Sequence, residues 1–189
     1  MNFEDFPEFC NSRDIVILDT SSFLSGYKGQ VCAKLGYFHD AISQYSALHI
    51  TPGVLDELLD IPNCENLDFR FSADEKPVYE KKVETLAEQF QHNGRVLEQI
   101  QITQYYSEDL LINLRHALSI TDLEIITTAI EHAKSHKSVG VCSNDRALRN
   151  IGDNVSTHLN LGIVYDCFPR NLPRSVFHQY RFSHSHAQK

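Results

Sequence analysis

The sequence predicts an α/β fold, a three-layer α/β/α domain in which helices cover both faces of a central parallel sheet. Three short apolar runs, at 15–18, 138–143 and 161–168, alternate with stretches in which apolar residues recur at helical spacing. The run at 15–18 contains no polar residue, which is typical of a strand buried on both faces of a sheet. Each run is therefore expected to be a parallel strand that is joined to the next through helices.

Helices are expected to fill the intervals between these strands. The first covers about 27–47, and the second begins at Pro52, because proline is favoured in the first turn of a helix. A third helix is expected from about 77 to 92. The assignment of 94–103 stays open between strand and helix.

Hydroxyl side chains indicate where the next helices begin. Ser107 can cap a helix that extends to about Ala117. Ser119 or Thr121 can cap a further helix that extends to about Ser135.

The composition is that of an ordinary globular protein, with 189 residues of which 42% are hydrophobic and 22% charged. We expect a single domain over 1–189, with an inserted or lengthened segment at about 62–104 and a basic, aromatic tail at about 168–189. The net charge of −8 does not favour nucleic-acid binding, although metal ions held by acids would reverse the local charge. The five cysteines form no CxxC pair and no apolar run reaches membrane-spanning length, so a cytoplasmic protein without a membrane partner is expected.

Two acidic residues directly follow predicted strands. Asp19 comes after the strand at 15–18. Asp145 comes after the strand at 138–143, and either Asn144 or Asp145 begins a helical turn. Ligands of parallel sheets bind outside the carboxyl ends of the strands, so both carboxylates belong to the edge where a site would form. Each also has a purely structural interpretation as a helix cap.

Two further acids lie on predicted helices. Asp122 in "SITD" completes a capping-box pattern with Ser119, and Glu57 lies in "LDELLD", where an acid on a helix surface is usually solvated. Asp122 also lies beside the apolar stripe of its helix with no Arg or Lys adjacent, although an unpaired buried charge is costly. Several carboxylates that converge without cations imply a hard metal ion, Mg²⁺ or Mn²⁺, bound through oxygen ligands.

Four motifs that contain these acids occur in the order typical of the PIN-domain ribonucleases, and the chain resembles that family. The motifs are "VILDTSSFLSG", "TPGVLDEL", "LSITDLEIITTAIEHAK" and "VGVCSNDRALRNIG", and the resemblance covers about 14–60 and 105–166. It implies a PIN-like fold and metal-dependent endonucleolytic cleavage of RNA, often single-stranded, that leaves a 5′-phosphate. The segment at about 62–104 departs from the family, because it is longer than in most members.

The resemblance also assigns site residues. It implies that the metal-binding and catalytic acids are Asp19, Glu57, Asp122 and Asp145. Metal ions held by acids lower the pKa of a bound water and clamp the phosphate. We expect Asp19 and Asp145 to be direct ligands, Asp122 a ligand of the same or a second ion, and Glu57 a ligand or the base that acts through water. The hydroxyls of Thr20 and Ser143 would orient water or phosphate, with Asn144 as a further polar contact.

Contacts with RNA must come from basic side chains. Arg146 and Arg149, beside Asp145, are candidates for phosphate contact. The tail also combines basic with aromatic residues, a mixture that suits single-stranded nucleic acid; these are Arg170, Arg174, Phe177, Tyr180, Arg181 and Phe182. The alternative for this tail is a disordered or oligomer-docking terminus. His132 and His136, at i and i+4, form a weaker candidate for a zinc site.

Other functions stay open. The chain is alternatively the toxin of a toxin–antitoxin pair, with a small antitoxin protein as partner, or a PIN scaffold without catalysis, and a homodimer is compatible with any of these. A phosphatase with Asp19 as nucleophile is rejected, because that chemistry requires a second acid at the position of Ser21.

Overall fold

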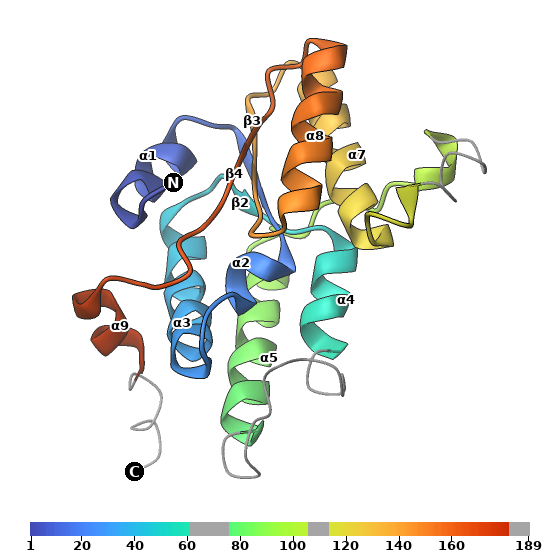
Figure 1. Ribbon diagram of the computed structural model, residues 1–189. Coiled ribbons are helices and arrows are strands. Elements are labelled where there is room, and N and C mark those ends of the chain that lie inside the picture. The colour runs from blue at the N-terminus through green and yellow to red at the C-terminus, as the bar shows by residue number, and fades with distance from the viewer. Residues whose placement is uncertain (61–75, 106–113, 182–189) are drawn as a thin grey trace.

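A central sheet of parallel strands organises the computed structural model, which describes residues 1–60, 76–105 and 114–181. The sheet has the order β2-β1-β3-β4 and consists of β1 (Ile15–Leu18), β2 (Leu48–His49), β3 (Val139–Cys142) and β4 (Val164–Asp166). In Figure 1, α7 and α8 lie on one side of the sheet and α1 and α3 on the other. The predicted α/β fold with a central parallel sheet is therefore confirmed.

The two inner strands are the predicted ones. β1 and β3 are buried along their whole length, and their register pairs Ile15 with Val139 and Leu18 with Cys142. β4 forms an edge of the sheet, where Val164 is 42% exposed. β2 was not predicted as a strand, because its two residues are too few for an apolar pattern to be visible.

The helices of the described residues are α1 (Phe6–Asn11), α2 (Thr20–Leu24), α3 (Lys28–Gln44), α4 (Pro52–Asp60), α5 (Lys76–His92), α7 (Ile120–Lys134), α8 (Arg146–Leu159) and α9 (Arg174–Arg181). The helices predicted at about 27–47, from Pro52 and at about 77–92 are confirmed by α3, α4 and α5. Ser119 rather than Thr121 caps α7. The start of the helix predicted from Ser107 lies outside the described residues.

Two predictions about secondary structure need correction. The segment 94–103 is neither a regular strand nor an α-helix: Val96 forms an isolated parallel bridge with Ile50, and the 3₁₀-helix η3 (Ile102–Gln104) ends the segment. The N–H of Leu97 donates to the carbonyl of Ile50 at 2.9 Å, so this segment continues the sheet beyond β2. After Asp145, a full helix of 14 residues, α8, replaces the predicted helical turn.

The tail differs most from its prediction. Residues 174–181 form α9, which packs on α3 (Figure 1) and buries Phe177 and Tyr180. Phe168 is fully buried, and its ring lies 4.7 Å from the ring of Phe38, between centroids. Because these rings are buried in the core, they are not free to stack on nucleic-acid bases, and residues 168–181 pack on the fold instead of forming a disordered terminus. Docking of the tail in an oligomer stays a prediction. Phe182 lies outside the described residues.

Among the residues that the structure describes, none of the helices combines the length and the apolar character that a bilayer span needs.

The 3₁₀-helix η1 (Phe3–Asp5) and α1 precede the sheet and were not predicted. Phe6 of α1 is fully buried and packs against Phe168, with 4.9 Å between ring centroids. The two ends of the described chain therefore meet in one aromatic cluster.

Removing the ring of Phe168 should destabilise the fold strongly. We expect Phe168→Ala to lower the free energy of unfolding by about 3–5 kcal/mol, because a large buried ring leaves a cavity that its neighbours cannot fill. Urea denaturation followed by circular dichroism measures the change. As a control, Val78→Ala on the exposed face of α5 should stay within about 0.5 kcal/mol of the wild type. Equal losses in both variants would mean that the Phe168 ring is not part of the core.

Candidate functional site

The carboxyl edge of the sheet brings the predicted acids into one region. Leu18 pairs with Cys142, so Asp19 and Ser143 leave neighbouring strands at the same level. The N–H of Asp19 continues the pairing by donating to the carbonyl of Cys142 at 3.0 Å. Figure 1 shows α2 directly beyond these strand ends, with the first turns of α4 and α7 nearby. This edge is therefore the candidate site.

Asp19 is the most buried of the predicted acids, with 4% of its surface exposed. Its Oδ2 caps α2 by accepting from the N–H of Ser21 at 3.3 Å, and it also accepts from the hydroxyls of Ser21 and Ser143. Burial raises the pKa of Asp19, the hydrogen bonds from Ser21 and Ser143 oppose this shift, and the nearby Glu57 carboxylate adds to it. Without a bound cation, the Asp19 carboxyl therefore takes up a proton more readily than an exposed aspartate does.

Asp122 lies in the first turn of α7 and is half-buried. It forms the predicted capping box, in which its Oδ2 accepts from the N–H of Ser119 at 2.7 Å and its own N–H donates to the Ser119 hydroxyl at 3.0 Å. Burial raises the pKa of Asp122, hydrogen bonds from Ser119 lower it, and repulsion from Asp19 and Asp145 raises it further. Asp122 therefore lies within electrostatic range of both Asp19 and Asp145.

Glu57 reaches the same edge from α4. The hydroxyl of Thr20 donates to Glu57 Oε2 at 2.5 Å. Thr20 itself is buried, with 8% of its surface exposed, so its hydroxyl proton fixes the carboxylate of Glu57.

The turn at 143–145 is joined to the start of α2. The buried hydroxyl of Ser143 donates to Asp19 Oδ2 at 2.7 Å and accepts from the N–H of Asp145 at 3.0 Å. The N–H of Asn144 donates to the hydroxyl of Ser21 at 2.7 Å. Asp145 is exposed, and its Oδ1 caps α8 by accepting from the N–H of Ala147 at 2.6 Å. Ser143 therefore contacts both acids that follow the inner strands.

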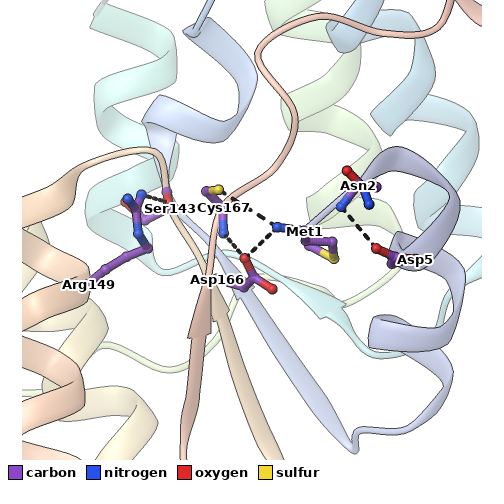
Figure 2. A network of polar contacts seen from close by, with 7 residues as sticks. All are labelled: Met1, Asn2, Asp5, Ser143, Arg149, Asp166 and Cys167. Atoms are coloured by element: carbon purple, nitrogen blue, oxygen red, sulfur yellow. Dashed lines mark hydrogen bonds and ion pairs between the residues drawn. The ribbon is translucent and has the colours of Figure 1, made fainter.

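The arginines of α8 differ in their contacts. Arg149 Nη1 donates to the carbonyl of Ser143 at 2.6 Å, as Figure 2 shows, so its guanidinium supports the turn below the site. Arg146 is exposed at the first position of α8.

Figure 2 also shows Asp166, at the end of β4, next to the amino group of Met1, with 2.9 Å between Oδ1 and the nitrogen. Asp166 is thus a paired acid and is not one of the candidates.

Each candidate carboxylate uses one oxygen for its contacts with the protein. These oxygens are Oδ2 of Asp19, Oε2 of Glu57, Oδ2 of Asp122 and Oδ1 of Asp145. The second oxygen of each accepts no hydrogen bond from the described part of the chain, and no Lys or Arg there forms an ion pair with any of them. Free carboxylate oxygens are the ligands that Mg²⁺ and Mn²⁺ prefer, so the chemistry of this donor set fits such an ion.

The chemistry of these acids suits a metal ion, but their spacing in the described part of the chain does not form a metal site. Within 1–60, 76–105 and 114–181, no three His, Cys, Asp or Glu side chains lie close enough together to hold a metal ion. His132 and His136, the weaker zinc candidate, are not part of such a group of three among the described residues. His132 belongs to α7, and His136 follows the end of that helix with a φ of 63°. The site is therefore an edge of mutually repelling carboxylates rather than a finished coordination sphere.

Glu124 is an acid at this edge that was not predicted. It is 6% exposed, and its Oε2 accepts from the N–H of Gly53 in the first turn of α4 at 2.9 Å. Burial raises its pKa, hydrogen bonds from Thr51 and Gly53 oppose the shift, and Asp56 and Glu57 add to it. A Cβ at position 53 would collide with the Glu124 carboxylate, so the glycine allows this contact. The sequence offered one signal: Glu124 lies inside an otherwise apolar stretch of α7.

A cleft of about 490 Å³ opens beside Glu57 and Glu124. Its walls come from α4, from the start of α7 and from the segment around Ile100 and Ile102. Asp56 and Asp60 add further carboxylates to the rim, so the cleft is acidic.

Comparison of the chain with models of protein families, with curated proteins and with solved structures finds no match in any of the three.

Replacing Asp19 should change the pH dependence of stability. Its raised pKa means that the folded protein binds this proton more tightly than the unfolded chain, so the stabilisation is present at low pH and is lost as the pH rises through the raised pKa. Without metal, we expect Asp19→Asn to lose less stability than the wild type as the pH rises above about 4, because its amide has no proton to lose. Chemical denaturation at a series of pH values measures this difference.

Asp14 provides the opposite control. Hydrogen bonds from Ser138 lower its pKa, so its stabilisation is present at neutral pH and is lost as the pH falls. Asp14→Asn should therefore alter the pH dependence in the opposite direction to Asp19→Asn. If both variants follow the wild-type profile, then neither burial at Asp19 nor the Ser138 hydrogen bonds at Asp14 shift a pKa in the way stated.

Proposed function

We propose that this chain is a metal-dependent ribonuclease of the PIN type. The observation that carries the proposal is the gathering of Asp19, Glu57, Asp122 and Asp145 at one sheet edge, with one free oxygen each and no cation from the described residues nearby. Mutual repulsion of this kind costs stability, and a bound divalent cation would relieve it. The sequence motifs that resemble the PIN family contain the same four acids.

The free oxygens of these acids would hold Mg²⁺ or Mn²⁺. When bound, such an ion lowers the pKa of a water molecule and neutralises charge on the phosphodiester. Because the carboxylates stand too far apart to form a finished coordination sphere, the proposal includes their closer approach when the cation binds. Thr20 and Ser143 fix one oxygen of Glu57 and of Asp19, and so leave the other oxygen to the ligand.

The proposed substrate is RNA in single-stranded form. Arg146 is exposed beside Asp145 and is the proposed phosphate contact. Arg149 contributes less directly, because its guanidinium already donates to the Ser143 carbonyl. Aromatic rings of the tail are not part of this proposal, since Phe177 and Tyr180 are buried.

Two other functions make different predictions. A catalytically idle scaffold is favoured by the incomplete metal geometry and predicts no cleavage with any metal. A toxin bound by a small antitoxin protein predicts cleavage that the partner suppresses. Incubation of the purified protein with RNA separates an idle scaffold from a nuclease.

The wild-type protein should cleave a mixed pool of single-stranded RNA with Mg²⁺ or Mn²⁺ and not with EDTA. Asp145→Asn should lower the rate by at least about 100-fold, because loss of an interaction that supports a metal ligand already costs 10–100-fold. Gel analysis of labelled RNA measures the rate. Asp153→Asn, an exposed acid further along α8, should cleave like the wild type. Equal losses in both variants, or cleavage in EDTA, would contradict the proposal.

Metal should also stabilise the folded protein. At a metal concentration of about 100 times the dissociation constant, we expect a gain of about 2.7 kcal/mol for the wild type, since the ion binds the folded chain. Asp19→Asn keeps an oxygen to cap α2 but loses a charged ligand, so its melting temperature should respond less. Thermal melts with increasing Mn²⁺ measure both responses. If Asp19 serves only as a cap, metal will shift the melting temperature of neither protein.

A further inference from the structure

Lys34 of α3 is a buried lysine with no assigned function in the acidic site. Its side chain is fully buried, and its Nζ donates to the carbonyl of Ser25 at 2.9 Å and to the Ser25 hydroxyl at 2.7 Å. The ammonium also lies over the ring of Phe168, 5.4 Å from its centroid. No carboxylate of the described residues pairs with it. A charge buried in this way normally costs stability.

Hydrogen bonds connect this lysine to the site. The Ser25 hydroxyl that accepts from Lys34 also accepts from Asn144 Nδ2 at 2.6 Å. The same nitrogen of Asn144 donates to the carbonyl of Ser21 at 3.2 Å, and a carbonyl can only accept, so the amide has one orientation. Ser21 in turn donates its hydroxyl to Asp19. A path of hydrogen bonds, completed by the covalent bonds of Ser21, therefore runs from Lys34 to Asp19.

We propose that Lys34 is a positioning residue of the acidic site, which acts by holding Ser25 so that Asn144 keeps the 143–145 turn against Asp19. This inference rests on the proposed function for its effect on cleavage. The coupling between Lys34 and Asn144 is independent of that function and can be measured separately.

The protonation of Lys34 should affect this path near neutral pH. Burial lowers the pKa of Lys34 to about 7, and the positive charge of Arg170 lowers it further. Among the described residues, Cys142 and Arg170 are the titratable groups that act on the lysine, and Cys142 would oppose the shift only as a thiolate. Burial raises the pKa of Cys142, so its thiol stays protonated through the same pH range. A neutral amine has two protons and a lone pair, so it can accept from the Ser25 hydroxyl and loosen its hold on that oxygen.

A matched control is available in Lys82 of α5. It is also buried, with 7% exposed, and it also donates to backbone carbonyls, of Cys32 at 3.0 Å and of Tyr180 at 3.4 Å. Burial lowers its pKa as well. Its contacts belong to α3 and α9, so no described contact joins it to the acidic edge. Replacing either lysine by methionine keeps an unbranched buried side chain and removes the charge and the hydrogen bonds.

The coupling is tested by NMR titration of the Asn144 side-chain amide, assigned by its loss in Asn144→Ser. In the wild-type protein we expect this resonance to shift with a midpoint at a pH of about 7. The shift should disappear in Lys34→Met and persist in Lys82→Met. An amide that does not titrate in the wild type, or that titrates equally in Lys34→Met, would overturn the proposal. The wild-type measurement stands even if a variant fails to fold.

Cleavage assays then test the consequence for the site. Lys34→Met should lower kcat by about 10-fold, as expected for a lost supporting interaction, with little change in KM, while it melts no lower than Lys82→Met. Lys82→Met should cleave like the wild type. Equal loss of kcat in both variants would reduce Lys34 to a structural role and overturn the inference. If the wild type does not cleave at all, the proposed function fails, whereas the NMR titration still decides the coupling.

Discussion

The pairing of β1 with β3 is the constraint on which the site depends. Because Leu18 pairs with Cys142, the residues that follow the two strands leave the sheet side by side. The hydroxyl of Ser143 then contacts Asp19, although 124 positions separate them along the chain. A shift of this register by one residue would turn every side chain of β1 to the opposite face and would separate the two. The backbone pairing of β1 with β3 therefore brings Asp19 and Ser143 together, independently of the side-chain hydrogen bonds that form between them.

The parts of the fold that the sequence predicted are those where burial leaves a simple pattern. Strands covered on both faces consist of uninterrupted apolar residues, so β1 and β3 could be predicted. β2 could not, because a strand of two residues has no periodicity. In the tail, Phe177 and Tyr180 were predicted to be available for stacking on nucleic acid because basic residues accompany them, whereas the structure buries both rings. The spacing of Phe177 and Tyr180, three residues apart, is also that of a helix with one buried face, and the structure has this arrangement.

The site illustrates why a capping residue and a candidate ligand are not exclusive interpretations. Asp19, Asp122 and Asp145 all lie at helix starts, as their sequence contexts predicted. A cap needs only one carboxylate oxygen, and the other oxygen keeps its lone pairs for a cation or for water. Glu124 escaped prediction because an acid within an apolar stretch has no local signal of its partner. That partner, the N–H of Gly53, comes from a distant helix.

The contact between Glu124 and Gly53 has a consequence for how the edge is built. It joins α7 to the first turn of α4 through a backbone group, and the absence of a Cβ at Gly53 brings the two helices close. Glu57 and Asp122 are therefore mounted on helices whose spacing does not depend on either carboxylate. Neutralising Glu57 or Asp122 should therefore leave the spacing of α4 and α7 unchanged, because the contact that joins these helices involves neither carboxylate. The charge of the edge and the contact that holds its helices together can thus vary independently of each other.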